Sequence, residues 1–201
     1  MATEISICSN ASLRLGGPTI SSFDEADVDG SNLDATRLAR NLWPTVRQTV
    51  LRKHSWNCAT SRVLLSPDAT APAFGFAYRY LLPADWLKTL QLGTEEECTF
   101  RWRTEGRYVV CDESALPLVY IYDNTNVPTW DAALVEAAEV AMAEAMCYPL
   151  TKSASMKQDL EAEFLRLIQQ ARTADAQDDP SETLGGSVLL ASRFGYWGGT
   201  R

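Results

Sequence analysis

Hydrophobic residues recur at helical spacing in the first quarter of the chain. Over residues 4–15 apolar side chains repeat every three or four positions, and Gly16-Gly17-Pro18 follows as a helix stop. A longer helix is predicted over residues 31–55, where apolar residues recur at steps of four: Leu38, Leu42, Val46 and Val50. Pro44 lies inside this helix and is expected to bend its axis without ending it.

Two further helices are predicted in the C-terminal third. Residues 129–146 are rich in alanine, which favours close helix packing, and apolar residues lie on or near one face of the segment. Pro149 is expected to interrupt the helical structure after this segment. A last helix is predicted from Thr151 to about Asp175, because its apolar residues form one stripe at helical spacing.

The pattern between residues 61 and 124 is that of a β region. Short β-branched or aromatic runs, bounded by Gly, Pro and Asp, predict five strands: Arg62–Leu65, Phe74–Tyr80, Thr99–Trp102, Arg107–Cys111 and Leu118–Tyr122. Thr104-Glu105-Gly106 is typical of a hairpin connection, with Gly106 at positive φ. The segment Leu82–Leu87 predicts a capped helical turn that Gly93 closes.

These elements predict an α+β fold with three parts. Residues 1–59 and 125–178 form a helical bundle of about four helices, and residues 60–124 form a small antiparallel β domain inserted into it. Residues 179–201 form an extended C-terminal arm. Residues 19–30 are polar and acidic, so they are expected to cross the surface as a solvated loop. A calcium-binding loop is not expected there, because the full calcium-loop pattern is absent.

Charge narrows the classes of function. The 201 residues carry 26 acidic and 18 basic side chains, a net charge of −8, and tight binding to a phosphate backbone needs clustered Lys and Arg. A dedicated nucleic-acid binder is therefore disfavoured, whereas an acidic surface suits DNA that must slide past without sticking. No apolar run is long enough to span a membrane, and no signal peptide is recognisable, so we expect a soluble chain made in a cytoplasm.

The cysteines and the histidine predict neither a disulfide framework nor a metal site. The five cysteines contain no CxxC pair and are read as small buried hydrophobes. His54, the single histidine, would need widely separated cysteines to complete a zinc site. We expect no metal and no cofactor.

The C-terminal arm carries the clearest functional signal. It begins with a polar stretch and a Gly-Gly pair, and then presents large apolar side chains that have no obvious site on their own domain. We expect this arm to dock on a partner, against the alternative that it folds back on its own chain. The residues expected to bind are Leu189, Leu190, Phe194, Tyr196 and Trp197.

Several sequence segments, taken in order, carry a family resemblance. They are Ala11–Phe23, Ala35–Arg40, Val50–Asn57, Tyr80–Leu87, and Gly106-Arg107 with Tyr120-Ile121-Tyr122. In this order and spacing they resemble the tail tubular protein A family of tailed bacteriophages. The likeness covers roughly residues 5–175, and the arm beyond is similar only in character.

The resemblance implies a structural virion protein at the head–tail junction, made in the host cytoplasm. Such an adaptor forms a homododecameric ring below the portal protein, and its C-terminal arm reaches onto portal subunits. Its β domain faces the tail nozzle or tail-tube protein, and genomic DNA passes through the lumen without sequence-specific binding. Proteins of this kind carry no catalytic residues, need no cofactor and bind no membrane.

Charged residues on two predicted helices are candidates for contacts between subunits. In an acidic ring, basic residues of one subunit more plausibly meet carboxylates of the next than DNA. The candidate residues are Arg37, Arg40 and Arg47 on one side and Glu136, Glu139 and Glu144 on the other. Trp56, which follows the long helix, could be an interface anchor but is expected to pack in the core.

Two other classes of function were weighed. A virion-associated hydrolase is suggested only by the many carboxylates, and the sequence has no GxSxG, HExxH or phosphate-binding glycine loop. A small regulatory binding module would act through the helical core as a defined small oligomer. The sequence therefore predicts a structural adaptor and not an enzyme.

Overall fold

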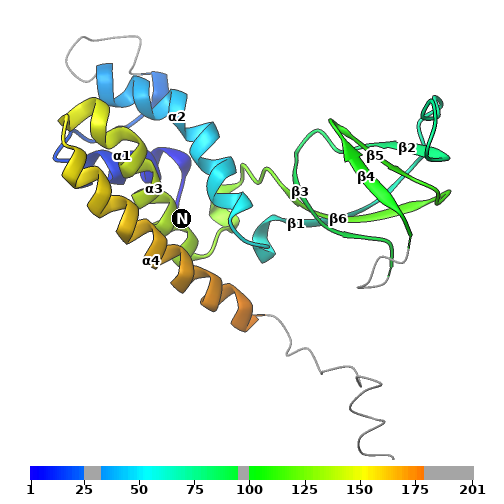
Figure 1. Cartoon of the computed structure of the whole chain (residues 1–201). Coiled ribbons are helices and arrows are strands. Elements are labelled where there is room, and N and C mark those ends of the chain that lie inside the picture. The colour runs from blue at the N-terminus through cyan, green and yellow to red at the C-terminus, as the bar shows by residue number, and fades with distance from the viewer. Residues whose placement is uncertain (25–32, 95–99, 179–201) are drawn as a thin grey trace, which may run out of the picture.

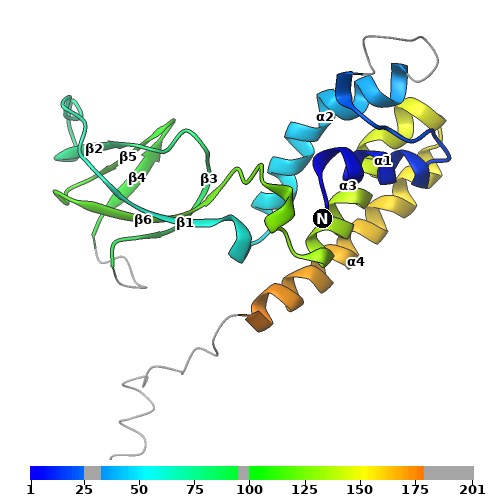
Figure 2. The same cartoon turned by 180° about the vertical axis from the view of Figure 1, so that it is seen from behind.

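The computed structural model describes residues 1–24, 33–94 and 100–178, which form a helical bundle and a β domain on opposite sides (Figures 1 and 2). The helices are α1 (Glu4–Arg14), α2 (Leu33–Arg52), α3 (Ala132–Thr151) and α4 (Ala154–Asp178), with short 3-10 helices at Asn57–Ala59 and Val127–Thr129. The strands are β1 (Thr60–Leu65), β2 (Tyr78–Leu81), β3 (Trp86–Leu92), β4 (Trp102–Glu105), β5 (Tyr108–Cys111) and β6 (Leu116–Tyr122). The predicted α+β class is confirmed.

Local capping chemistry sets where the helices begin. The Thr3 hydroxyl accepts a hydrogen bond from the Ser6 backbone N–H, and the Ser6 side chain accepts one from the Thr3 N–H, which together form a capping box for α1. Asp131 caps α3 by accepting a bond from the Ala133 N–H at 2.8 Å. Both caps satisfy amide groups that have no partner inside the helix.

Two prolines lie inside helices without ending them. Helix α2 runs through Pro44, as expected. The predicted interruption at Pro149 is wrong, because α3 also continues through its proline to Thr151 and ends at Lys152, whose φ of 57° is left-handed. Pro149 lies in the last turn of α3, so little of the helix follows the missing amide donor. In the same turn the Thr151 hydroxyl donates to the Cys147 carbonyl.

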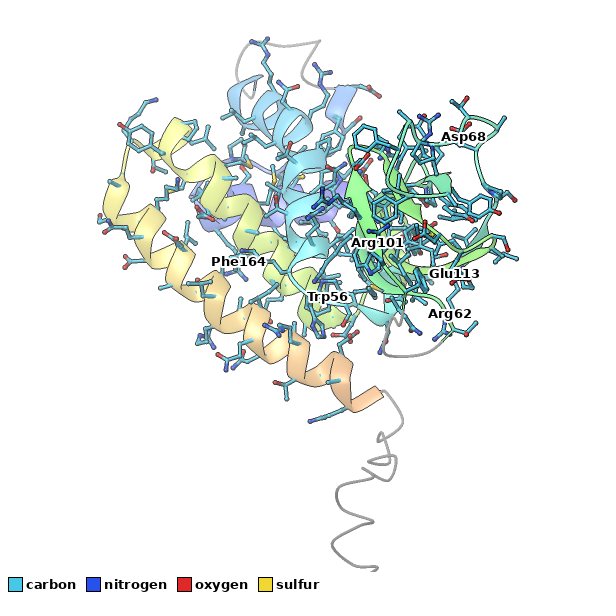
Figure 3. The ribbon with its side chains drawn as sticks, turned by 45° about the vertical axis from the view of Figure 1, so that its right-hand side comes forward. Trp56, Arg62, Asp68, Arg101, Glu113 and Phe164 are labelled. Carbon is cyan, nitrogen blue, oxygen red and sulfur yellow. The ribbon has the colours of Figure 1, made fainter. Side chains whose placement is uncertain are left out.

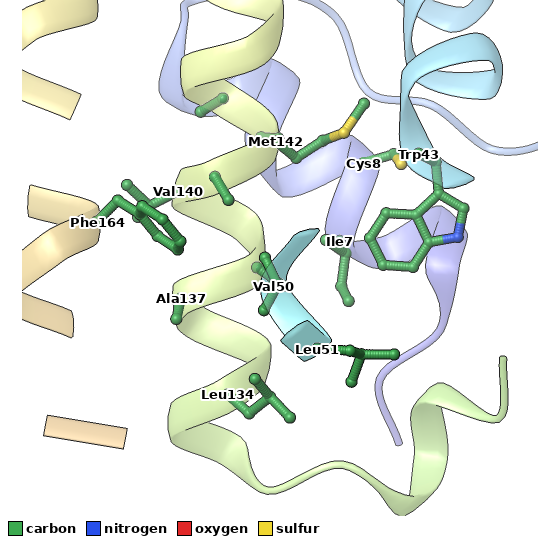
Figure 4. Packing of buried hydrophobic residues seen from close by; sticks show 14 of the residues in the cluster. Ile7, Cys8, Trp43, Val50, Leu51, Leu134, Ala137, Val140, Met142 and Phe164 are labelled. Atoms are coloured by element: carbon green, nitrogen blue, oxygen red, sulfur yellow. The ribbon is translucent and has the colours of Figure 1, made fainter. Parts of the chain in front are cut away.

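Helix α3 is the centre of the bundle, because α1, α2 and α4 all pack on it. Four of its alanines, Ala137, Ala138, Ala141 and Ala143, are buried with larger apolar side chains of α3 and with residues of the other three helices. Figure 4 shows Leu134, Ala137 and Met142 in this core. Trp56 is 1% exposed in this core and donates from Nε1 to the Val50 carbonyl at 3.1 Å. The prediction that Trp56 packs inside the molecule is confirmed.

The β domain consists of two antiparallel three-stranded sheets with strand orders β1-β6-β3 and β2-β5-β4. Their facing sides share a second apolar core of nine buried residues: Leu65, Tyr80, Leu82, Leu92, Val109, Cys111, Leu116, Leu118 and Tyr120. The predicted hairpin at Gly106 joins β4 to β5, and its φ of 61° is the left-handed conformation that glycine adopts without strain. All six strands lie between Thr60 and Tyr122.

The described β region has six strands where five were predicted, and several bounds differ: β4 continues through Thr104 and Glu105, which were predicted as part of the hairpin connection. The helical turn expected at Leu82–Leu87 is wrong: the chain makes a tight turn and enters β3, whose residues pair with β6, and Gly93 ends a strand. The strand expected at Phe74–Tyr80 starts only at Tyr78. The loop before it is tied to this strand by Asp68, whose backbone N–H donates to the Arg79 carbonyl and whose carboxylate accepts from the Arg79 side chain. The strand expected from Thr99 to Trp102 starts at Trp102.

Candidate functional site

The residues expected to bind a partner through the C-terminal arm, Leu189, Leu190, Phe194, Tyr196 and Trp197, lie outside the described residues. Their role is a prediction. Most of the acidic loop, residues 25–30, also lies outside them. The described residues place the start of the arm, the six charged candidates and the open faces of the β domain.

Arg47 joins the bundle to the base of the β domain. Its Nε and Nη2 donate to the two carboxylate oxygens of Asp123 at 2.7 and 2.8 Å, and the Gln48 side chain adds a third bond at 2.9 Å. Arg47 is 8% exposed. Burial acts to raise the pKa of Asp123, but the hydrogen bonds from Arg47 and Gln48 and the charge of Arg47 outweigh it, so this pKa lies below its ordinary value.

The other charged candidates lie on α2 and α3. Arg37 and Glu136 are exposed, and Arg40 reaches the Phe23 carbonyl at 3.5 Å. Glu139 accepts from Asn10 at 2.7 Å and lies 3.8 Å from Arg14.

Glu144 lies 3.7 Å from Lys157. Arg47 pairs with Asp123, Glu139 with Arg14, and Glu144 with Lys157. Arg47, Glu139 and Glu144 therefore have partners within their own chain, and pairing across subunits is a prediction for all six.

The end of α4 is fixed beside the entrance to β1. The Asp175 carboxylate accepts from the Asn57 N–H at 3.2 and 3.3 Å, and the Asn57 side chain donates to the Asp175 carbonyl at 3.1 Å. His54 Nε2 lies 3.6 Å from the same carboxylate, and its ring meets Trp56 edge-on at 4.9 Å. Sequence reasoning missed this cluster, because Asn57 and Asp175 are far apart in the chain.

The nearby Cys58 is not a thiolate at neutral pH. Burial, and then the charge of Asp175, raise the pKa of its thiol to about 11. Its backbone carbonyl accepts hydrogen bonds from the Tyr122 hydroxyl at 3.2 Å and from the Asn124 side chain at 2.6 Å. These contacts join the segment before β1 to the end of β6.

One face of the β1-β6-β3 sheet contains an open groove of about 440 Å³. Strand pairing sets Arg62, Val119 and Gln91 in one row across the sheet and Leu64 opposite Pro117 in the next. Leu64 is 66% exposed. The lining contains no carboxylate, histidine or cysteine; it comprises Arg62, Val63, Leu64, Gln91, Gly93, Thr94, Pro117, Leu118 and Val119.

The edge strand β4 presents a second exposed surface, with all four of its residues exposed. Trp102 is 41% exposed. Arg101, labelled in Figure 3, stacks over Phe76 at 4.7 Å and donates to the Gly75 carbonyl at 2.7 Å. Its guanidinium is therefore held on the loop before β2.

Within the described residues no group of three or more His, Cys, Asp or Glu side chains is arranged to hold a metal ion. No described helix is long and apolar enough to cross a membrane. Comparison of the whole chain with family models and with curated proteins found no match. Inference about function therefore starts from the residues and contacts described above.

Proposed function

We propose that this chain is a structural adaptor at the head–tail junction of a tailed-phage virion, forming a ring below the portal protein. The proposal rests first on the ordered segments that resemble the tail tubular protein A family. The observation from the fold that supports it best is the position of the end of α4. Asp175 fixes this end of α4 at the junction between the bundle and the β domain, and the arm follows it in the sequence.

This position lets one chain meet different partners in different directions. The bundle and the β domain lie on opposite sides of the junction (Figure 1). The arm supplies apolar anchors for portal subunits, and the distal part of the β domain, with exposed Leu64, Phe74 and Leu81, supplies apolar side chains for a nozzle or tail-tube protein.

Contacts between neighbouring subunits use the charged faces of α2 and α3. Arg37 and Glu136 are exposed, and complementary charges fix the register of a repeated interface. The net charge of −8 suits a channel through which DNA passes without adhesion. No contact among the described residues favours a virion-associated hydrolase or a regulatory binding module.

Portal attachment tests the proposal. Deleting residues 187–201 should abolish co-assembly with purified portal rings, because the arm carries the apolar anchors. A triple substitution, Phe194→Ser with Tyr196→Ser and Trp197→Ser, should weaken binding by at least about tenfold, since loss of a single aromatic anchor commonly costs more than about 2 kcal/mol. Sedimentation of the ring complexes measures both.

The control removes an apolar side chain outside the arm. Leu13→Ser, at a position 50% exposed on α1, should leave portal binding unchanged. Truncated protein that fills portal rings at full occupancy would show that the arm is not the attachment device.

A further inference from the structure

The open groove on the β1-β6-β3 sheet continues a face that the bundle already covers in part. Ile121 on this face is fully buried in the bundle core, and it pairs with Thr60 and Lys88. Two residues along β6, Val119 lies on the same face but outside the bundle, and the groove opens there. This face of the β1-β6-β3 sheet therefore extends beyond the part that the helical bundle covers.

The arm begins within reach of this groove. Asp175 bonds to Asn57, and β1 starts three residues after Asn57. From Thr60 to Leu64 the strand advances about 13 Å, whereas residues 179–186 can span up to about 28 Å when extended. Figure 3 labels Arg62 at the lower right of the β domain, and α4 ends below this domain in the same view.

The arm also has the chemistry that this groove would accept. After residues 179–186 comes the aliphatic run Val188-Leu189-Leu190-Ala191, which suits a lining built around Leu64, Pro117 and Val119. The preceding residues include Asp179 and Glu182. Arg62, which lines the groove, is complementary in charge to them.

We propose that in the free protein residues 188–191 dock in the groove of their own chain, and that the portal protein draws them out. The same chain is the favoured occupant, because a short tether gives the arm an effective concentration in the millimolar range, far above that of a second copy in solution. The arm is then stored on the β domain until a portal ring is present. The docking itself does not depend on the proposed function. The displacement of the arm by the portal protein does rest on it.

Methyl NMR of the full-length protein tests the docking. The expected result is nuclear Overhauser contacts from the Leu189 and Leu190 methyls to those of Leu64 and Val119. The double variant Leu189→Asp with Leu190→Asp should lose these contacts and shift the Leu64 and Val119 resonances. The control, Ser181→Asp with Thr183→Asp, adds the same charge upstream of the aliphatic run and should retain the contacts.

Mixed labelling identifies the occupant. Contacts that appear only between differently labelled molecules would assign the groove to a second copy and overturn the proposal, as would the absence of any contact in the unmodified protein. Equal loss of the contacts in the Ser181/Thr183 control would also overturn it, because the effect would then not depend on the aliphatic run.

Portal binding separates the docking from the proposed function. Leu64→Asp should tighten portal binding, about tenfold if nine-tenths of the arms are docked, because only a free arm can bind. Leu13→Asp, an equal charge change on the bundle, should not. Docking contacts in a protein that never binds the portal would refute the adaptor role alone, whereas portal binding without docking contacts would refute the stored arm alone.

Discussion

At the scale of single residues, one pair of charges connects the two parts of the molecule. Arg47 and Asp123 are 76 positions apart, yet their side chains form two parallel hydrogen bonds that are largely shielded from water. Paired charges in such a setting are worth more than surface ion pairs, and losing one partner leaves the other charge buried and uncompensated. Through this contact α2 holds the residue that follows β6.

Asp123→Asn should lower the free energy of unfolding by about 2–4 kcal/mol at pH 7, because it removes the charge that Arg47 faces. The folded pKa of Asp123 lies below the ordinary value of 3.8, so the stabilisation is present above that value and is lost as the pH falls through the folded pKa. The unmodified protein and the Asp123→Asn variant should therefore differ less in free energy of unfolding as the pH falls from about 5 to about 3, a range around the ordinary pKa. Urea unfolding at each pH measures this difference.

The matched control is Glu144→Gln, which removes a carboxylate charge from the more exposed ion pair with Lys157 and should cost less than about 1 kcal/mol. A stability difference for Asp123→Asn that stays constant from neutral to acidic pH would show that charge is not its source.

Sequence reasoning could place Trp56 in the core but could not find the partner of Arg47. A large aromatic side chain at the end of a long amphipathic helix has few positions outside a core, so its burial follows from local pattern. The pairing of Arg47 with Asp123, or of Asn57 with Asp175, depends on how distant elements meet. The residues next to each partner in the sequence do not predict that these elements come into contact.

At the scale of elements, α3 holds the bundle together through small side chains. Ala137, Ala138 and Ala143 are fully buried, which lets three other helices approach the α3 backbone closely. The alanine-rich composition of residues 129–146 indicated close packing before the fold was known. The same close packing makes the helix intolerant of larger residues.

Ala138→Leu should destabilise the protein by about 1–3 kcal/mol, because added methyl groups in a filled core force neighbours out of their preferred conformations. Ala132→Leu introduces the same side chain at an exposed position of the same helix and should change stability by less than about 0.5 kcal/mol. Thermal and urea unfolding of the pair measure the difference. Equal stabilities would mean that the bundle core has unfilled space at Ala138.

Helices were predicted from sequence more accurately than strands, for a physical reason. The apolar stripe of α2 repeats over many turns, so one proline does not obscure it. Strand β3 follows a Pro-Ala-Asp turn, so the sequence at its start resembles a capped helical turn, and its pairing with β6 contains two irregularities. Pairing with β6, a long-range contact, decides its conformation.

At the scale of the whole molecule, the account joins an acidic body to an apolar arm. The net charge of −8 belongs to the whole chain and disfavours tight binding to a phosphate backbone. In the sequence the arm follows α4, whose Asp175 bonds to Asn57. Composition predicts the arm, and the order of the segments is the ground on which the adaptor role is proposed. The groove that we propose as the storage site of the arm could not be predicted from sequence, because it exists only after β1, β6 and β3 have paired.

Electron cryomicroscopy of portal rings assembled with the full-length protein tests the central claim most directly. The account predicts a ring of copies below the portal, with the Leu189–Trp197 segment of each copy packed against portal subunits. An arm buried wholly within its own chain in that assembly, with no neighbouring subunit touching it, would contradict the account.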